Sequence, residues 1–240
     1  MGIIIAGAIA VGLAFLTIGT VMLRATPPAD RRLLAVAFLI ALPLQPLVFY
    51  AVRLPIDALV RSFLGLTVTW GLVAVLYAPF TEEPAKWLPL ALPSLRRKLT
   101  PANAVPLALA IGLGFGIGEI CFLTRAVILS PNYPDLPFWQ FYGFILERVE
   151  ICFLHGVFVA APVVGLVLGR SFWPGAIVGV LLHLLVNFPI FLAQLGAFGL
   201  SGRAWSLILI AWLVAAVVAG AVVLCRLHHR LTRAAQKPAQ

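Results

Sequence analysis

The chain has 240 residues, of which 62% are hydrophobic and 10% are charged, and its formal net charge is +9. A soluble globular domain is about 45–50% apolar and about 25% charged. This composition therefore excludes a soluble or a disordered protein and predicts an integral membrane protein. The net charge does not indicate a nucleic-acid partner, because no basic stripe alternates with aromatic residues along the sequence. The lipid bilayer is the expected surrounding of the chain.

Apolar segments of about 20 residues, the length that crosses a bilayer, recur along the whole chain. The first one begins directly after Met1 without the basic region of a signal peptide, so we predict that it is a retained span. We predict an all-α, polytopic transmembrane helical bundle that forms a single integral membrane domain over residues 1–240, with a basic, poorly ordered tail over 228–240. The seven predicted spans cover residues 2–23, 33–52, 63–80 (continuing to about 93), 104–129, 143–168, 172–196 and 205–227.

The basic residues predict the orientation. If the N-terminus is outside, the inner segments carry eleven Lys and Arg residues and the outer loops carry three, namely Arg53, Arg61 and Arg203. An excess of basic residues marks the cytoplasmic side. We therefore expect a plasma-membrane protein with its N-terminus outside and its C-terminus in the cytoplasm, and the composition rich in Ala, Leu and Arg points to a bacterial source.

The third predicted span is irregular because it is rich in proline. Each proline removes a backbone donor and tends to kink or break a helix. Thr81 could cap a new helical segment whose first turn contains Glu82 and Glu83. We therefore predict that prolines break this span, at a place where the chain faces protein or a water-filled cavity. The prolines are Pro79, Pro84, Pro89 and Pro93.

Acidic residues are scarce, and five of the eight are glutamates within apolar stretches: Glu82, Glu83, Glu119, Glu147 and Glu150. Ionisable groups inside a membrane are costly, so each one suggests a function. Lys86 lies three and four residues after the glutamate pair and can bind either carboxylate on a helix. The other carboxylate would then be free to act as a general base. The alternative is an interfacial charge cluster that caps a helix.

Glu119 follows a run in which every second residue from 112 to 118 is glycine, a pattern that permits close helix packing. The alternative to a functional glutamate is a packing interface with one hydrogen-bonded carboxylate. Arg148 could bind Glu119, Glu147 or Glu150, and the sequence does not choose among them. Glu147 and Glu150 are expected closer to water.

Two histidines and an asparagine complete the polar residues of the spans. His155 lies in the middle of the fifth span, and His183 and Asn187, four residues apart, share a face of the sixth. Each of them alone could be a structural contact between helices, but together with Glu119 and the Glu82–Glu83 pair they could form one wet cavity. Asn187 could fix the tautomer of His183 or stabilise an oxyanion. Such a set could activate water through a glutamate base, or through Zn²⁺ bound by His155, His183 and Glu119.

Four motifs occur in order on successive spans: Glu82-Glu83-Pro-Ala-Lys86, Gly-Phe-Gly-Ile-Gly-Glu119, Arg148 with His155 seven residues later, and His183-Leu-Leu-Val-Asn187. Together they resemble the PrsW family of intramembrane proteases, which is related to the type II CAAX prenyl endopeptidases and the bacteriocin-processing enzymes. The resemblance covers a core of about residues 79–190. Ile151 stands where the CAAX-type pattern has an aromatic residue, which favours the PrsW-like branch.

The resemblance implies an intramembrane peptidase that acts on a membrane-embedded or membrane-anchored protein. By position, it assigns catalytic roles to Glu82 or Glu83, His155, His183 and Asn187, and supporting roles to Lys86, Glu119 and Arg148. It leaves open whether the site uses Zn²⁺ or only a glutamate-activated water. The alternative is a proton- or cation-coupled transporter or a metal-binding membrane sensor, because carboxylates and histidines in membranes also form proton relays.

Overall fold

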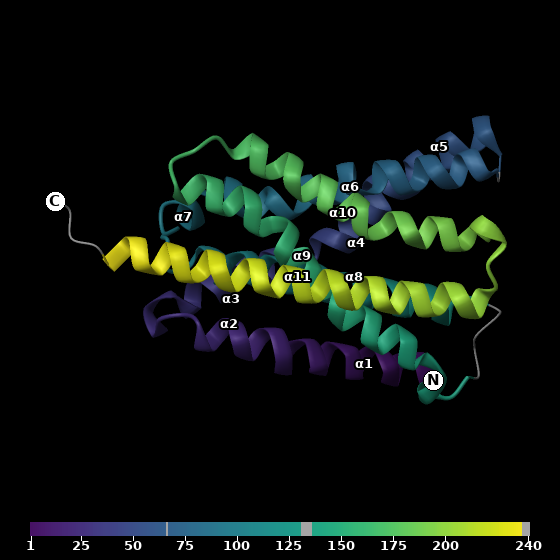
Figure 1. Ribbon diagram of the computed structural model, residues 1–240, viewed down its shortest axis with the longest axis horizontal. Helices are drawn as coiled ribbons and strands as arrows, with labels where there is room; N and C mark the ends of the chain where they lie inside the picture. The colour runs from purple at the N-terminus through teal and green to yellow at the C-terminus, as the bar shows by residue number, and fades with distance from the viewer. Residues whose placement is uncertain (66, 131–135, 237–240) are drawn as a thin grey trace.

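The computed structural model describes residues 1–65, 67–130 and 136–236, and within these ranges every regular element is a helix. The helices run back and forth along the long axis of an elongated bundle (Figure 1). This confirms the predicted all-α architecture. Asp135 and the last four residues of the predicted tail lie outside the described ranges.

The first two spans are long and contain π-helical turns. The first consists of α1 (Gly2–Ala14), η1 (Phe15–Gly19) and α2 (Thr20–Arg24). The second consists of η2 (Pro28–Asp30), α3 (Arg31–Ala41), α4 (Leu44–Val48), η3 (Phe49–Arg53) and α5 (Leu54–Leu64). The second stretch is therefore longer than the predicted 33–52, and the placement of Arg53 and Arg61 in an outer loop is wrong. Both residues are helical, because Pro55 occupies the first turn of α5, where proline is tolerated.

The third predicted span is not broken. Helix α6 runs without interruption from Val68 to Ala91, with three prolines inside it, and a short α7 (Pro93–Arg96) follows. Thr81 does not cap a new segment, since its hydroxyl donates back to the carbonyl of Ala78 at 2.8 Å. Neighbouring helices can hold a proline-containing membrane helix together, and α6 packs against α10 and α4.

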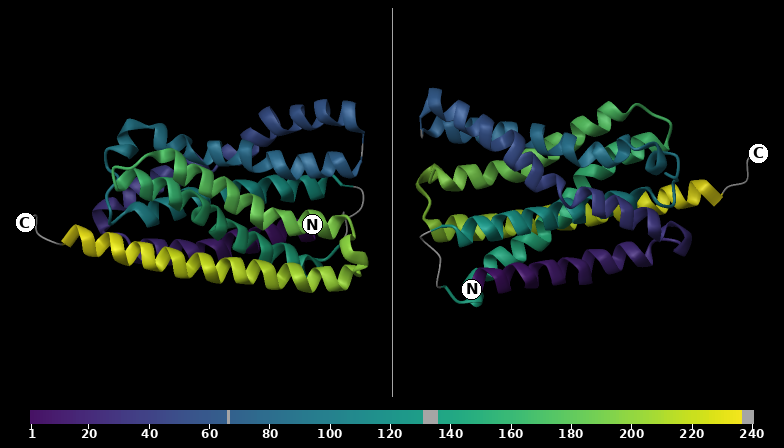
Figure 2. Two further views of the ribbon diagram at one scale, coloured as in Figure 1. Left: turned by 45° about the horizontal axis from the view of Figure 1, so that its top comes forward. Right: turned by 180° about the vertical axis from the view of Figure 1, so that it is seen from behind.

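The remaining helices follow the predicted spans closely. They are α8 (Ala104–Ile128), η4 (Phe138–Phe141), α9 (Tyr142–Val167), α10 (Phe172–Gln194), η5 (Ala197–Gly199) and α11 (Gly202–Gln236). Helix α11 continues through residue 236, so the prediction of an irregular tail from 228 is wrong for the described part of that tail. Figure 2 shows α11 along one side of the bundle and α5 at its periphery.

Six helical stretches among the described residues are long and apolar enough to cross a membrane: Gly2–Arg24, Pro28–Leu64, Ala104–Ile128, Phe138–Val167, Phe172–Gln194 and Gly202–Ala234. Helix α6 is not among them, because polar residues such as Glu82, Glu83 and Lys86 lower its hydropathy. Several membrane-crossing helices therefore fit the structure, but a count of seven is not confirmed.

Helix α8 forms the centre of the bundle, and its glycines allow close contact with α9. A Cβ atom added at Gly112 would lie 2.1 Å from the backbone nitrogen of Gly156, and one at Gly116 would lie 2.6 Å from the Sγ of Cys152. The alternate glycines of the run face the chain around Phe38 and Leu42 instead. The predicted close packing is confirmed, and it brings Glu119, directly after the run, against α9.

Candidate functional site

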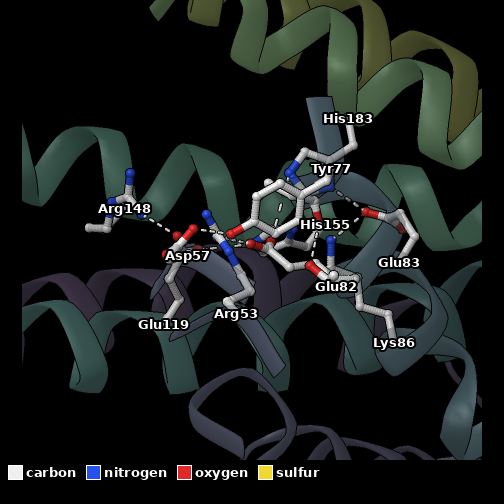
Figure 3. Close-up of polar contacts among 12 residues, drawn as sticks. Arg53, Asp57, Tyr77, Glu82, Glu83, Lys86, Glu119, Arg148, His155 and His183 are labelled. Carbon is white, nitrogen blue, oxygen red and sulfur yellow. Dashed lines mark hydrogen bonds and ion pairs between the residues drawn. The ribbon is translucent and has the colours of Figure 1, made fainter. Parts of the chain in front are cut away.

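Polar side chains from several helices converge inside the bundle, as the close-up shows (Figure 3). Helix α6 supplies a glutamate pair and a lysine, α8 a glutamate, α9 an arginine and a histidine, and α10 a histidine, while an arginine comes from η3. Every one of these side chains except the arginine of η3 was a candidate from the sequence. They are Arg53, Glu82, Glu83, Lys86, Glu119, Arg148, His155 and His183.

Lys86, Glu83 and His183 form a closed triad. The Lys86 Nζ lies 2.5 Å from the Glu83 Oε1, and the same oxygen lies 2.6 Å from the Nδ1 of His183. The side chains of Lys86 and Glu83 have no exposed surface. Phe158 stacks on the His183 ring and also lies against the Lys86 ammonium. The predicted pairing of Lys86 with one glutamate is therefore present, and its partner is Glu83.

Arg148, Glu119 and His155 form a second triad of the same chemical type. The Arg148 Nη1 lies 2.9 Å from one oxygen of Glu119, and the His155 Nε2 lies 3.0 Å from the other. Arg148 also binds Glu147 at 2.7 Å, so it takes two of the three partners that the sequence left open. The Nδ1 of His155 is buried and has no hydrogen-bond partner in the described structure.

Glu82 has a cation of its own, which the sequence analysis missed. The Arg53 Nη1 lies 2.6 Å from the Glu82 Oε1, and its guanidinium lies over the rings of Phe49 and Tyr77. The Tyr77 hydroxyl donates a hydrogen bond to Asp57. The spacing of Arg53 and Asp57, four residues apart, is typical of a helix and was the available signal that the chain stays helical here.

The histidines of the two triads lie close to each other, and one of them lies close to Glu82. The ring centroids of His155 and His183 are 5.8 Å apart, and the His183 Nε2 lies 3.8 Å from the Glu82 Oε2. Glu82, Glu83 and Glu119 each have a cation within ion-pair distance: Arg53, Lys86 and Arg148 respectively. Such pairing is what allows buried carboxylates to stay charged at an acceptable cost.

A cavity of about 420 Å³ lies between these side chains. Its polar lining consists of Arg53, Glu82, Glu119, Glu147, Arg148, His155, His183, Asn187 and Gln194. Glu83 and Lys86 do not line it, so only one member of the glutamate pair has access to the cavity. The remaining wall is largely apolar and comes mainly from the first half of α6 and the second half of α10, including Ala74, Ala78, Val186 and Ile190.

Asn187 lines the cavity but makes no hydrogen bond to any described residue. It therefore does not fix the tautomer of His183, because the Nδ1 of that ring contacts Glu83 instead. Its amide is free for a ligand in the cavity.

Each of the three proposed zinc ligands has another partner in the described structure. Among the described residues, no group of three or more His, Cys, Asp or Glu side chains could hold a metal ion. Each histidine is instead bound to a different carboxylate, His155 to Glu119 and His183 to Glu83.

Comparison with known proteins adds no family or structural relative, since no family model, curated protein or solved structure matches the chain.

Proposed function

We propose that the chain is an intramembrane endopeptidase that hydrolyses a peptide bond of a membrane-embedded or membrane-anchored protein. The observation that carries the proposal is the cavity inside the bundle, whose lining includes Glu82 and two histidines that are each bound to a different glutamate. The order of the motifs, which resembles the PrsW family, supports the same activity.

The attacking water is assigned to the part of the cavity beside Glu82 and His183, within hydrogen-bond reach of both. Glu83 is held as a carboxylate by Lys86, so a neutral His183 donates its Nδ1–H to Glu83 and presents its Nε2 as an acceptor. The Glu82 Oε2 is a second acceptor 3.8 Å away. A water between two acceptors donates a hydrogen bond to each and keeps its oxygen lone pairs for the attack. Glu82 then takes the proton as the general base.

Other groups of the cavity wall would bind the substrate and support the site. Attack on the peptide carbonyl creates an oxyanion, and the unpaired amide of Asn187 can donate to it. Glu119 holds the Nε2 of His155 and fixes that ring at the cavity wall, while Arg148 holds Glu119. Glu82 returns the proton to the leaving amine, which completes the hydrolysis.

We further propose that α6 is the seventh span. Its 24 residues would extend roughly 36 Å as a helix, which is enough to cross the hydrocarbon core. The chain would then lie in a bacterial plasma membrane with its N-terminus outside and its C-terminus in the cytoplasm, as the distribution of basic residues predicts.

The test is cleavage of a single-span reporter protein reconstituted with the purified chain in lipid nanodiscs. Glu82→Gln, His155→Ala and His183→Ala are each expected to abolish cleavage. His228→Ala is the matched control, because this histidine lies on α11 and does not line the cavity. If the three variants cleave as well as the control, the assignment is wrong.

Two additional measurements separate the alternatives. Cleavage that persists with a chelator supports a glutamate-activated water, whereas cleavage that is lost and returns with Zn²⁺ supports the metal mechanism. Proton or cation flux in proteoliposomes, lost in the same variants and without any cleavage, would favour a transporter.

A further inference from the structure

One acidic residue differs from all others in the described structure. Six of the seven described acids contact a side-chain donor: Asp30 with Asn103, Asp57 with Tyr77, Glu82 with Arg53, Glu83 with Lys86, and Glu119 and Glu147 with Arg148. Glu150 alone has neither a hydrogen bond nor an ion pair within the described ranges.

Glu150 lies on the side of α9 that faces away from the catalytic cavity. It follows Arg148 by two residues, which places the two side chains on nearly opposite sides of a helix. It is eight residues into α9, roughly 12 Å along the helix from its first residue. Glu150 is therefore far enough along a membrane-crossing helix for its charge to need a partner.

Glu150 lines a groove of about 540 Å³ between the first span, α9 and α11. The wall is mostly apolar and includes Leu16, Val21, Phe153 and Val217, with Arg24 as the other charged residue. Arg24 makes no ion pair with Glu150 in the described structure. The wall also includes the π-helical turn Phe15–Gly19, and such turns often occur at functional sites.

We propose that this groove docks a transmembrane helix of a partner protein that carries a Lys or Arg side chain within the membrane. A carboxylate inside a membrane is normally paired. Glu150 is unpaired on a mostly apolar wall whose cation, Arg24, is the last residue of the first span, so the groove is complementary to an apolar helix with a cation at the depth of Glu150.

A second copy of this chain is a poorer match, because its cations Arg53, Lys86 and Arg148 are already bound to glutamates. Its Arg125 lies in the last turn of α8, at the end of that helix, and donates to the Tyr50 hydroxyl.

The docked helix is distinct from the segment that would be cleaved. The groove and the catalytic cavity share no lining residue and lie on different sides of α9. The inference therefore concerns an accessory or regulatory partner and does not depend on the proposed peptidase activity.

The experiment measures binding of synthetic polyleucine transmembrane peptides to the full chain in phosphatidylcholine nanodiscs by fluorescence transfer. The peptides differ at one central position, which is Lys, Leu or Glu. Wild type is expected to bind the Lys peptide at least tenfold more tightly than the Leu peptide. Glu150→Gln is expected to lose this preference, and Glu150→Lys to prefer the Glu peptide.

Two variants test the location. Glu147→Gln removes a carboxylate from the same helix on the cavity side and is expected to keep the Lys preference. Val217→Trp fills the groove and is expected to weaken binding of all three peptides. The proposal is overturned if Glu150→Gln keeps the preference of the wild type or if Val217→Trp binds normally.

Other occupants give different results. If the preference disappears in phosphatidylethanolamine but not in phosphatidylcholine, a lipid amine occupies the groove. If the wild type self-associates and Glu150→Gln does not, the groove binds a second copy. Either result overturns the proposal.

Discussion

The two triads each consist of a cation, a carboxylate and an imidazole, but they differ in their access to the cavity. In Lys86–Glu83–His183, the lysine and the glutamate are fully buried and do not line the cavity. In Arg148–Glu119–His155, all three side chains line the cavity, and the Glu119 side chain is 19% exposed. The same cation–carboxylate–imidazole arrangement therefore occurs once with its cation and carboxylate shut off from the cavity and once with all three groups at the cavity wall. We call the first the closed triad and the second the open triad.

This difference suggests a division of roles between the glutamates. A carboxylate without access to the cavity cannot touch a substrate, so Glu83 can act only by fixing His183. Glu82, its neighbour in the sequence, reaches the cavity and can act as the base. Loss of a side chain without access to the cavity should therefore mainly reduce stability. Loss of a side chain that lines the cavity should mainly reduce catalysis.

The largest effect is expected for Glu82→Gln compared with Glu83→Gln. The first removes the proposed general base and should lower kcat by about 10²–10⁴-fold in a protein that still folds. The second leaves the buried Lys86 ammonium unpaired and should reduce the yield of folded protein. Reporter cleavage and thermal unfolding of the two purified variants give the comparison. A folded, inactive Glu83→Gln beside an active Glu82→Gln would exchange the two roles.

Removing the cations tests the closed and the open triad directly. Lys86→Met leaves Glu83 without a cation in a fully buried place and should lower the free energy of unfolding by about 3–5 kcal/mol. Arg148→Met should cost less, because Glu119 keeps its contact with His155 and faces a cavity that water can enter. The double variant Glu83→Gln/Lys86→Met should regain much of the loss. Equal losses in the two single variants would show that access to the cavity does not matter.

Arg53 is expected to act on catalysis through Glu82. It touches the proposed base at 2.6 Å, so Arg53→Gln lets the carboxylate move and should lower kcat by roughly 100-fold, with a smaller change in KM. Tyr77→Phe, which removes the hydrogen bond to Asp57, should lower kcat less. The measurement is steady-state cleavage of the reporter.

Rescue distinguishes positioning from a loss of structure. Added guanidinium should restore part of the activity of Arg53→Ala, and Arg53→Lys should retain more activity than Arg53→Gln. Arg61→Gln is the matched control, because Arg61 lies over Trp70 without binding a carboxylate in the described structure. If Arg61→Gln and Arg53→Gln lose the same activity, Arg53 has no specific role.

Much of the fold and of the site could be predicted from the sequence because membrane helices depend on local patterns. Apolar length predicts the spans, and the scarcity of charge makes Glu119, His155 and His183 conspicuous. The pairing of Arg148 could not be predicted, because it depends on how α8 and α9 are rotated against each other. The continuity of α6 depends on its packing, which the proline pattern does not contain.

Arg53 and Glu150 are two residues whose surroundings could not be predicted from the sequence. Arg53 was expected in a loop and is bound to Glu82, because the helix continues past Pro55. The sequence did not show that Glu150 lies on the face of α9 away from the cavity, where it lines a mostly apolar groove. In both cases the residue type was visible in the sequence, but the face of the helix on which it lies was set by tertiary packing.

The smallest effect is expected for a change in the packing of α8 against α9, which supports the open triad. Gly112→Ala places a Cβ against the backbone of α9 and should cost about 1–3 kcal/mol of stability, because one of the helices must shift. The shift should also lengthen the contact between Glu119 and His155, whereas the contact between Glu83 and His183 should change less. Cleavage should fall as a result. Gly12→Ala is the control, since an added Cβ there meets no atom within 4 Å. Thermal unfolding and cleavage by both variants check this, and a stable, fully active Gly112→Ala would show that the contact between α8 and α9 is looser than the structure has it.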